Sequence, residues 1–207
     1  KESDQLRQSK IQWGRLAGLS VLYFIITFTT LVITFYLSFL LEKYHFPQEL
    51  SSVMISLFFL AIMLPGLILN LIISRVRSMT IFVSLCLIVV GLLLVGTVPD
   101  VPLMTLGVVL TGVGYGVLQP IIYDKTAIIA PPETATKALS VVMTVNYVAV
   151  VVCPFVVDFA ERLFRQKEES FPFVASAVLV AMVAFLSLLM RKSFVLGLDE
   201  SYYRVKS

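Results

Sequence analysis

Long stretches without a charged residue alternate with short charged segments along the whole chain. There are six such stretches, each 20 to 26 residues long. About 20 apolar residues in an α-helix span the hydrocarbon core of a bilayer. The pattern therefore predicts six transmembrane helices, and no ten-residue alternation typical of barrel strands occurs. The stretches cover residues 16–41, 50–74, 78–99, 101–123, 138–157 and 170–190.

The composition supports this fold class. Apolar residues make up 58% of the 207 residues and charged residues 14%, whereas soluble domains are about 25% charged. Cys86 and Cys153 lie inside apolar stretches, which predicts buried thiols and not a disulfide or a metal site. We predict an all-α, polytopic membrane protein with a linker or interfacial segment at 1–15, a six-helix domain at 16–190 and a tail at 191–207.

Lysine and arginine predict the orientation. Twelve of the sixteen lie in the segments before the first stretch, after the second, after the fourth and after the sixth, and four lie on the other side. Because cytoplasmic loops are enriched in these residues, we expect both termini in the cytoplasm and a multi-pass protein of a bacterial inner membrane. Trp13 fits an interfacial anchor beside the first helix. The loops on the predicted cytoplasmic side include Arg75, Arg77, Lys125 and Lys137.

Two stretches carry polar stripes at helical spacing. In the fourth, Tyr115 and Gln119 are four residues apart, beside Gly112 and Gly116, which would let another helix approach closely. In the first, the stripe is Tyr23, Thr27, Thr30 and Thr34. Polar groups in lipid need partners, so both stripes are predicted to face a shared substrate cavity. Two alternatives are that the glycines only pack helices and that the threonines bond to their own backbone.

The polar features repeat with a period of three stretches. The first and fourth are striped, the second and fifth contain proline and asparagine, and the third and sixth are plain, so the third is expected to be lipid-facing support. This order suggests two three-helix repeats, as transporters have. After the second stretch, Asn70 is followed by Arg75 and Arg77, which either mark topology or bind helix-end carbonyls in a conformational role.

These features resemble the C-terminal six-helix half of a major facilitator superfamily transporter. Gly66-x-x-x-Asn70 with Arg75 and Arg77 is similar to that family's loop motif, with asparagine in place of the acid. The glycine-rich segment 112–116 and Pro120 are similar to its tenth helix. The resemblance implies that the first and fourth helices line the cavity, and that the second and fifth move against an N-terminal six-helix half or a second copy.

We therefore expect secondary active transport of a small, neutral or amphipathic solute by alternating access, because neither stripe is charged. The alternative is a non-transporting membrane scaffold. A six-span channel is disfavoured because no arginine-rich helix or carbonyl filter occurs. An enzyme is disfavoured because the stretches hold no histidine and no paired acids. The expected partners are a solute and the lipid bilayer, with no cofactor, metal or nucleic acid.

Overall fold

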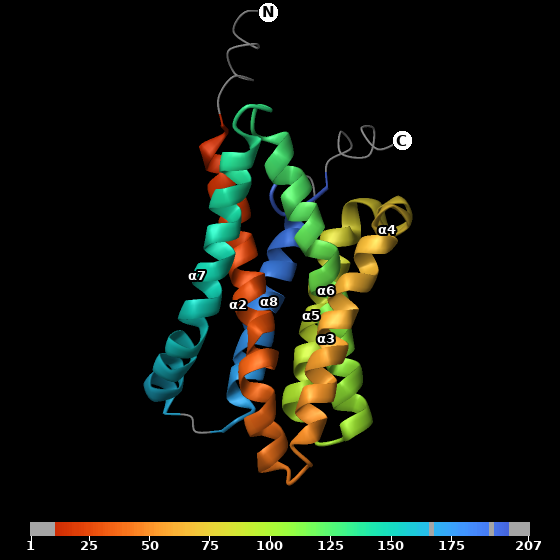
Figure 1. Cartoon of the computed structure of the whole chain (residues 1–207), viewed down its shortest axis with the longest axis vertical. Coiled ribbons are helices and arrows are strands. Elements are labelled where there is room, and N and C mark those ends of the chain that lie inside the picture. Colours follow the sequence, from red (N-terminus) through yellow and green to blue (C-terminus); the bar gives the residue numbers. More distant parts are fainter. Residues whose placement is uncertain (1–10, 166–167, 191–192, 199–207) are drawn as a thin grey trace, which may run out of the picture.

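The computed structural model describes residues 11–165, 168–190 and 193–198, and every regular element within them is a helix (Figure 1). Six helical segments are long and apolar enough to cross a membrane, which confirms the predicted all-α fold with six spans. The described elements are α2 (Trp13–Lys43), α3 (Glu49–Leu67), α4 (Leu69–Val76), the 3₁₀ turn η1 (Arg77–Met79), α5 (Thr80–Thr97), α6 (Val101–Ile128), α7 (Ala135–Phe164) and α8 (Phe171–Leu189).

Parts of the predicted flanking segments lie outside the described residues. These parts are residues 1–10 of the N-terminal segment, and 191–192 and 199–207 of the C-terminal tail. Residues 193–198 of that tail are described, and they pack on the bundle.

The boundary between the second and third spans differs from the predicted one. The predicted stretch 50–74 is broken at Ile68, between α3 and α4, and α4 continues through η1 into α5 as one membrane-spanning segment. Pro65 lies just before the break, where its ring removes a backbone N–H and disfavours a regular helix. The amide of Ile68 donates to the carbonyl of Pro65, closing a tight turn. Asn70 and Arg75 therefore belong to the segment that leads into α5.

The six spans are buried to different degrees. α2 and α6 are the most enclosed: in an apolar stretch of 18 residues within each helix, 67% and 56% of the residues are buried. The corresponding values for α3 and α7 are only 28% and 22%. In Figure 1, α7 lies at one side of the bundle and α3 lies at the front of the other side, with α2 and α8 between them. α5 is half buried, with Ser84, Ile88 and Leu92 inside the bundle and Val83, Val90 and Leu93 exposed.

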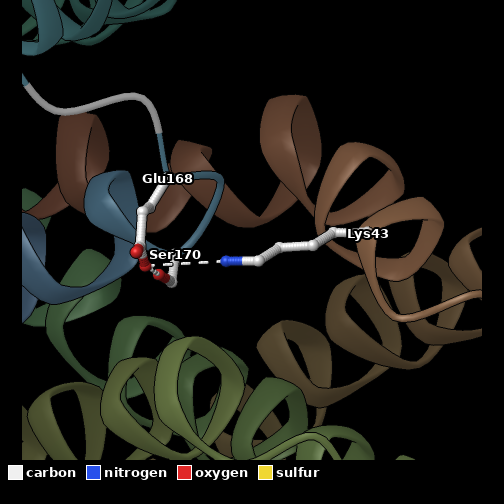
Figure 2. A network of polar contacts seen from close by, with 3 residues as sticks. All are labelled: Lys43, Glu168 and Ser170. Atoms are coloured by element: carbon white, nitrogen blue, oxygen red, sulfur yellow. Dashed lines mark hydrogen bonds and ion pairs between the residues drawn. The ribbon is translucent and has the colours of Figure 1, made fainter.

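The two ends of the bundle differ in charge. The end where α2 begins and α6 and α8 finish is called the basic end here, since it carries Arg15, Arg75, Arg77, Lys125 and Lys137. At the opposite end, Lys43 Nζ lies 3.6 Å from Glu168 Oε2, and Ser170 Oγ donates to the same oxygen over 3.3 Å (Figure 2). This pair ties the end of α2 to the segment before α8.

Candidate substrate-binding site

The polar stripes of α2 and α6 meet inside the bundle. The hydroxyl of Tyr23 lies 2.8 Å from that of Tyr123 and 3.4 Å from that of Tyr115. Thr27 Oγ1 lies 3.2 Å from the hydroxyl of Tyr115. The ring of Tyr23 stacks on Tyr115 with centroids 6.4 Å apart and meets Tyr123 edge-on at 5.6 Å. Buried aromatic pairs of this kind add packing energy and fix the rings relative to each other.

A third helix completes this cluster. Asn146 of α7 accepts a hydrogen bond from Thr27 Oγ1 at 2.8 Å, and its Oδ1 lies 3.4 Å from the Tyr115 hydroxyl. On α6, Gln119 Nε2 donates to the Tyr123 hydroxyl over 3.2 Å. We call these six residues the tyrosine cluster. They are Tyr23, Thr27, Tyr115, Gln119, Tyr123 and Asn146.

The tyrosine cluster contains one group with a choice of partners. The Tyr115 hydroxyl has a single proton, yet the oxygens of Thr27, Tyr23 and Asn146 all lie within 3.4 Å of it. A hydroxyl donates only one hydrogen bond at a time. The O–H bond of Tyr115 can therefore rotate to donate to a different acceptor without any change in the helices. The cluster can therefore rearrange its hydrogen bonds when a solute supplies a new donor or acceptor.

The cluster has a closed side and an open side. Tyr23, Thr27 and Tyr115 are buried, whereas Gln119, Tyr123 and Asn146 are only half-buried. Within the described residues, the amide nitrogen of Asn146 and the side-chain oxygen of Gln119 make no hydrogen bond. The open side thus offers a donor and an acceptor. All six side chains are neutral, which suits hydrogen bonding and aromatic contact and not the capture of an ion.

Two predicted cavity residues lie outside the tyrosine cluster. Thr30 Oγ1 donates to the backbone oxygen of Ile26 at 2.8 Å, so its hydroxyl is satisfied within α2. Thr34 Oγ1 is buried and has no hydrogen-bond partner among the described residues. The stripe on α2 therefore divides: of its four residues, Tyr23 and Thr27 make the hydrogen bonds to α6 and α7 found in the described part of the chain.

Glycines of α6 determine how closely its neighbours approach. A Cβ on Gly112 would lie 2.7 Å from the backbone oxygen of Phe58 and 2.8 Å from the Cβ of Ala61, both on α3. A Cβ on Gly116 would overlap the backbone of Ile62, one turn further along α3. The two glycines therefore form the surface of α6 on which α3 rests, on either side of Tyr115 in the chain.

The residues of the predicted conformational loop lie at the basic end, away from the cluster. Asn70, Arg75 and Arg77 are exposed, and within the described residues their side chains form no hydrogen bond or ion pair. Arg77 has φ 51° and ψ −128°, a conformation that residues with a side chain seldom adopt. This residue makes the sharp turn from α4 into η1.

Two residues of the cluster were not predicted. Tyr123 continues the α6 stripe four residues after Gln119, at the last position of the uncharged stretch 101–123. Asn146 is a lone amide in the fifth stretch, and a lone amide in a membrane helix requires a polar partner. The spacing in the first case and this requirement in the second were the signals available.

An apolar groove between α2 and α7 runs beside the cluster. It starts near the exposed Trp13 at the basic end and reaches Phe24 and Val145, which adjoin Tyr23 and Asn146 in the chain. The complete lining is Trp13, Leu16, Ala17, Ser20, Val21, Phe24, Val141 and Val145. Seven of these eight side chains are apolar, and none of the eight belongs to the tyrosine cluster.

Comparison with known proteins identifies one family. The family model described as Major Facilitator Superfamily matches residues 2–154. No curated protein and no solved structure matches the chain. The matched region contains α2 to α6 and most of α7, and hence all six residues of the tyrosine cluster.

Proposed function

The chain belongs to the major facilitator superfamily, and we propose that it is the C-terminal six-helix half of a secondary transporter. Members of this family are transporters and not enzymes. The proposed solute is small and neutral or amphipathic, and it binds at the tyrosine cluster. The observation that carries this proposal is the neutral, hydrogen-bonded junction of α2, α6 and α7. On its open side, the amide nitrogen of Asn146 and the amide oxygen of Gln119 make no hydrogen bond within the described residues.

The second six-helix unit is proposed to cover α3 and α7. These two spans are the least buried of the six, and α7 exposes large apolar side chains along its length, such as Tyr147, Phe155 and Phe159. A second unit on these faces would enclose the open side of the cluster between the two halves. The unit is either an N-terminal half or a second copy. Alternating access then arises when the halves rock against each other about the bound solute.

The membrane orientation is part of the proposal. Arg15, Arg75, Arg77, Lys125 and Lys137 share the basic end, and basic residues favour the cytoplasmic side. The basic end, with both termini, is therefore assigned to the cytoplasm of a bacterial inner membrane. The apolar groove, which has Trp13 at this end, would hold the apolar part of an amphipathic solute.

A pair of threonine variants tests the role of the cluster. Solutes are first selected from a panel of neutral, amphipathic, phosphorylated and dicarboxylate compounds by the rise they cause in the thermal midpoint of the intact protein. Thr27→Val removes the hydroxyl that joins Tyr115 to Asn146 and is expected to weaken binding about three- to tenfold, the value of one neutral hydrogen bond. Counterflow of the selected solute in proteoliposomes should fall accordingly.

Thr29→Val is the matched control. Thr29 lies two residues from Thr27 on the same helix, is equally buried, and donates only to backbone oxygens of its own helix. Its replacement should leave binding and counterflow unchanged. Equal effects of the two variants, or selection of the dicarboxylates alone, would refute binding at the cluster. A protein that neither binds any compound nor shows counterflow is instead the non-transporting scaffold.

A further inference from the structure

Residues 193–198, which follow α8, fold back onto the basic end of the bundle. We call residues 193–198 the return segment. The amide of Gly197 donates to the carbonyl of Ser193 over 2.9 Å, so the segment forms a compact turn. Its last described residue, Leu198, is 2% exposed, and the side chain of Val195 lies directly against Gly18 of α2. A tail that only carried charge into solvent would not bury these side chains.

Lys125 of α6 is enclosed by the return segment. Its side chain is 2% exposed, and its ammonium donates to the carbonyl of Gly197 at 2.6 Å and to that of Val195 at 3.2 Å. The ring of Phe194 lies 5.6 Å away, close enough for a cation–π contact. Within the described residues, no ion pair includes Lys125. A buried ammonium needs polar partners, so the segment and the lysine hold each other.

Two further contacts attach the return segment to α8 and α2. Ser187 Oγ of α8 donates to the carbonyl of Leu196 over 2.6 Å. The guanidinium of Arg15, on α2, lies 5.0 Å from the centre of the Phe194 ring, the same ring that Lys125 contacts. The six residues therefore link the ends of three helices, in addition to the backbone hydrogen bond from the amide of Gln12, before α2, to the carbonyl of Ile129, after α6, over 3.3 Å.

The part of α6 held in this way lies beyond a proline. Pro120 lacks a backbone N–H and removes one hydrogen bond of the helix, so residues 121–128 are less firmly tied to the preceding part of α6. Tyr123 and Lys125 both belong to these eight residues. A displacement of Lys125 about Pro120 would therefore also move Tyr123 away from Tyr23.

We propose that the return segment is a latch that holds residues 121–128 of α6 against α2 and α8. While it is docked, Tyr123 stays hydrogen-bonded to Tyr23 and the tyrosine cluster is closed toward the basic end. When it leaves, Lys125 becomes hydrated, residues 121–128 move about Pro120, and the cluster opens on that side. This inference rests on the proposed function, because it assigns to the latch the opening of the proposed binding site.

Cysteine labelling of the intact protein tests the two steps separately. Leu198→Cys places a thiol in the buried part of the latch, and Gln119→Cys places one in the cluster. The rate of reaction with a maleimide measures the exposure of each, with the parent protein, which has only Cys86 and Cys153, as the baseline. Lys125→Met keeps the length of the side chain and removes its donors. It should raise both rates about tenfold, as expected for the loss of a hydrogen bond to a charged group.

Two variants keep this test decisive. Lys137→Met removes an exposed lysine at the same end and should change neither rate. Ser187→Ala removes the bond to Leu196 without altering α6, so it decides the question if Lys125→Met does not fold. It should raise both rates about threefold.

Each outcome has a defined meaning. If Lys125→Met leaves the maleimide reaction of Leu198→Cys unchanged, Lys125 does not hold the return segment and the proposal is overturned. A faster rate there with an unchanged rate at Gln119→Cys shows that release does not open the cluster and also overturns it. Neither rate requires a solute. A protein that binds no compound of the panel but shows both increases has the latch and lacks the proposed transport function.

Discussion

Gly116 provides the sharpest test of the packing around the tyrosine cluster. A Cβ at this position would overlap the carbonyl oxygen of Ile62 and lie 2.9 Å from its Cα and carbonyl carbon. These are backbone atoms of α3, which cannot rotate away as a side chain can. Even Gly116→Ala must therefore push α3 from α6, and Gly116→Leu must push it further.

The magnitude follows from two opposing contributions. Overpacking of a tight contact costs about 1–3 kcal/mol, whereas replacing glycine inside a helix gains about 0.5–1 kcal/mol. Gly116→Ala is thus expected to lower the free energy of unfolding by about 0–2.5 kcal/mol. For Gly116→Leu the loss reaches at least about 2 kcal/mol, because three further carbons enter space that the α3 backbone fills. This corresponds to a thermal midpoint lowered by roughly 4–8 °C.

The assay is thermal unfolding of the purified protein in detergent, with two glycines as controls. A Cβ on Gly14 or on Gly66 would meet no atom within 4 Å. Gly14→Ala and Gly66→Ala should therefore leave the midpoint unchanged or raise it slightly. A Gly116→Leu protein that unfolds at the temperature of the parent would show that α3 does not rest on this glycine, and the arrangement of α3 beside Tyr115 would be wrong.

Two further predictions concern the ends of the bundle. Cysteines that replace Lys43 and Arg165 should react with an impermeant maleimide added outside intact cells, and a cysteine at Arg77 should not, because the basic end is assigned to the cytoplasm; labelling of Arg77→Cys from outside would reverse the orientation. Glu168→Gln should change the free energy of unfolding by less than about 1 kcal/mol, since its ion pair with Lys43 is solvent-exposed. The change is measured from the shift of the thermal midpoint. A larger loss of free energy of unfolding would mean that this contact is a main attachment of α8.

Helix number and the faces of α6 follow from local sequence, and the break in the second span does not. The six apolar stretches match six membrane-spanning segments because the thickness of the bilayer fixes the length of each. The four-residue spacing of Gly112 and Gly116 puts both on one face, which is where α3 lies. The uncharged stretch 50–74 contains Pro65, but proline is tolerated in many membrane helices, so its presence does not predict that the chain breaks at Ile68.

The tyrosine cluster is less accessible to sequence reasoning than the helices are. Its two shortest contacts, both 2.8 Å, join Tyr23 to Tyr123, residues 100 positions apart, and Thr27 to Asn146, which are 119 apart. Periodicity shows that Thr27, Thr30 and Thr34 share a face, but all of these hydroxyls can also bond within their own helix. Which threonine turns to a neighbouring helix depends on what that helix presents, and only the assembled bundle shows it.

Lys125 agrees with the positive-inside rule, but its position in the structure depends on burial, which that rule does not consider. Counting lysines and arginines places it with the topology signals at the basic end, and the count takes no account of burial. In the structure the ammonium is almost fully enclosed and held by two backbone carbonyls of residues some 70 positions later in the chain. The two roles are compatible, because a lysine at the membrane boundary has water within reach once the return segment leaves. Deep inside the bilayer the same ammonium would have no such alternative, and a reversible contact could not be built on it.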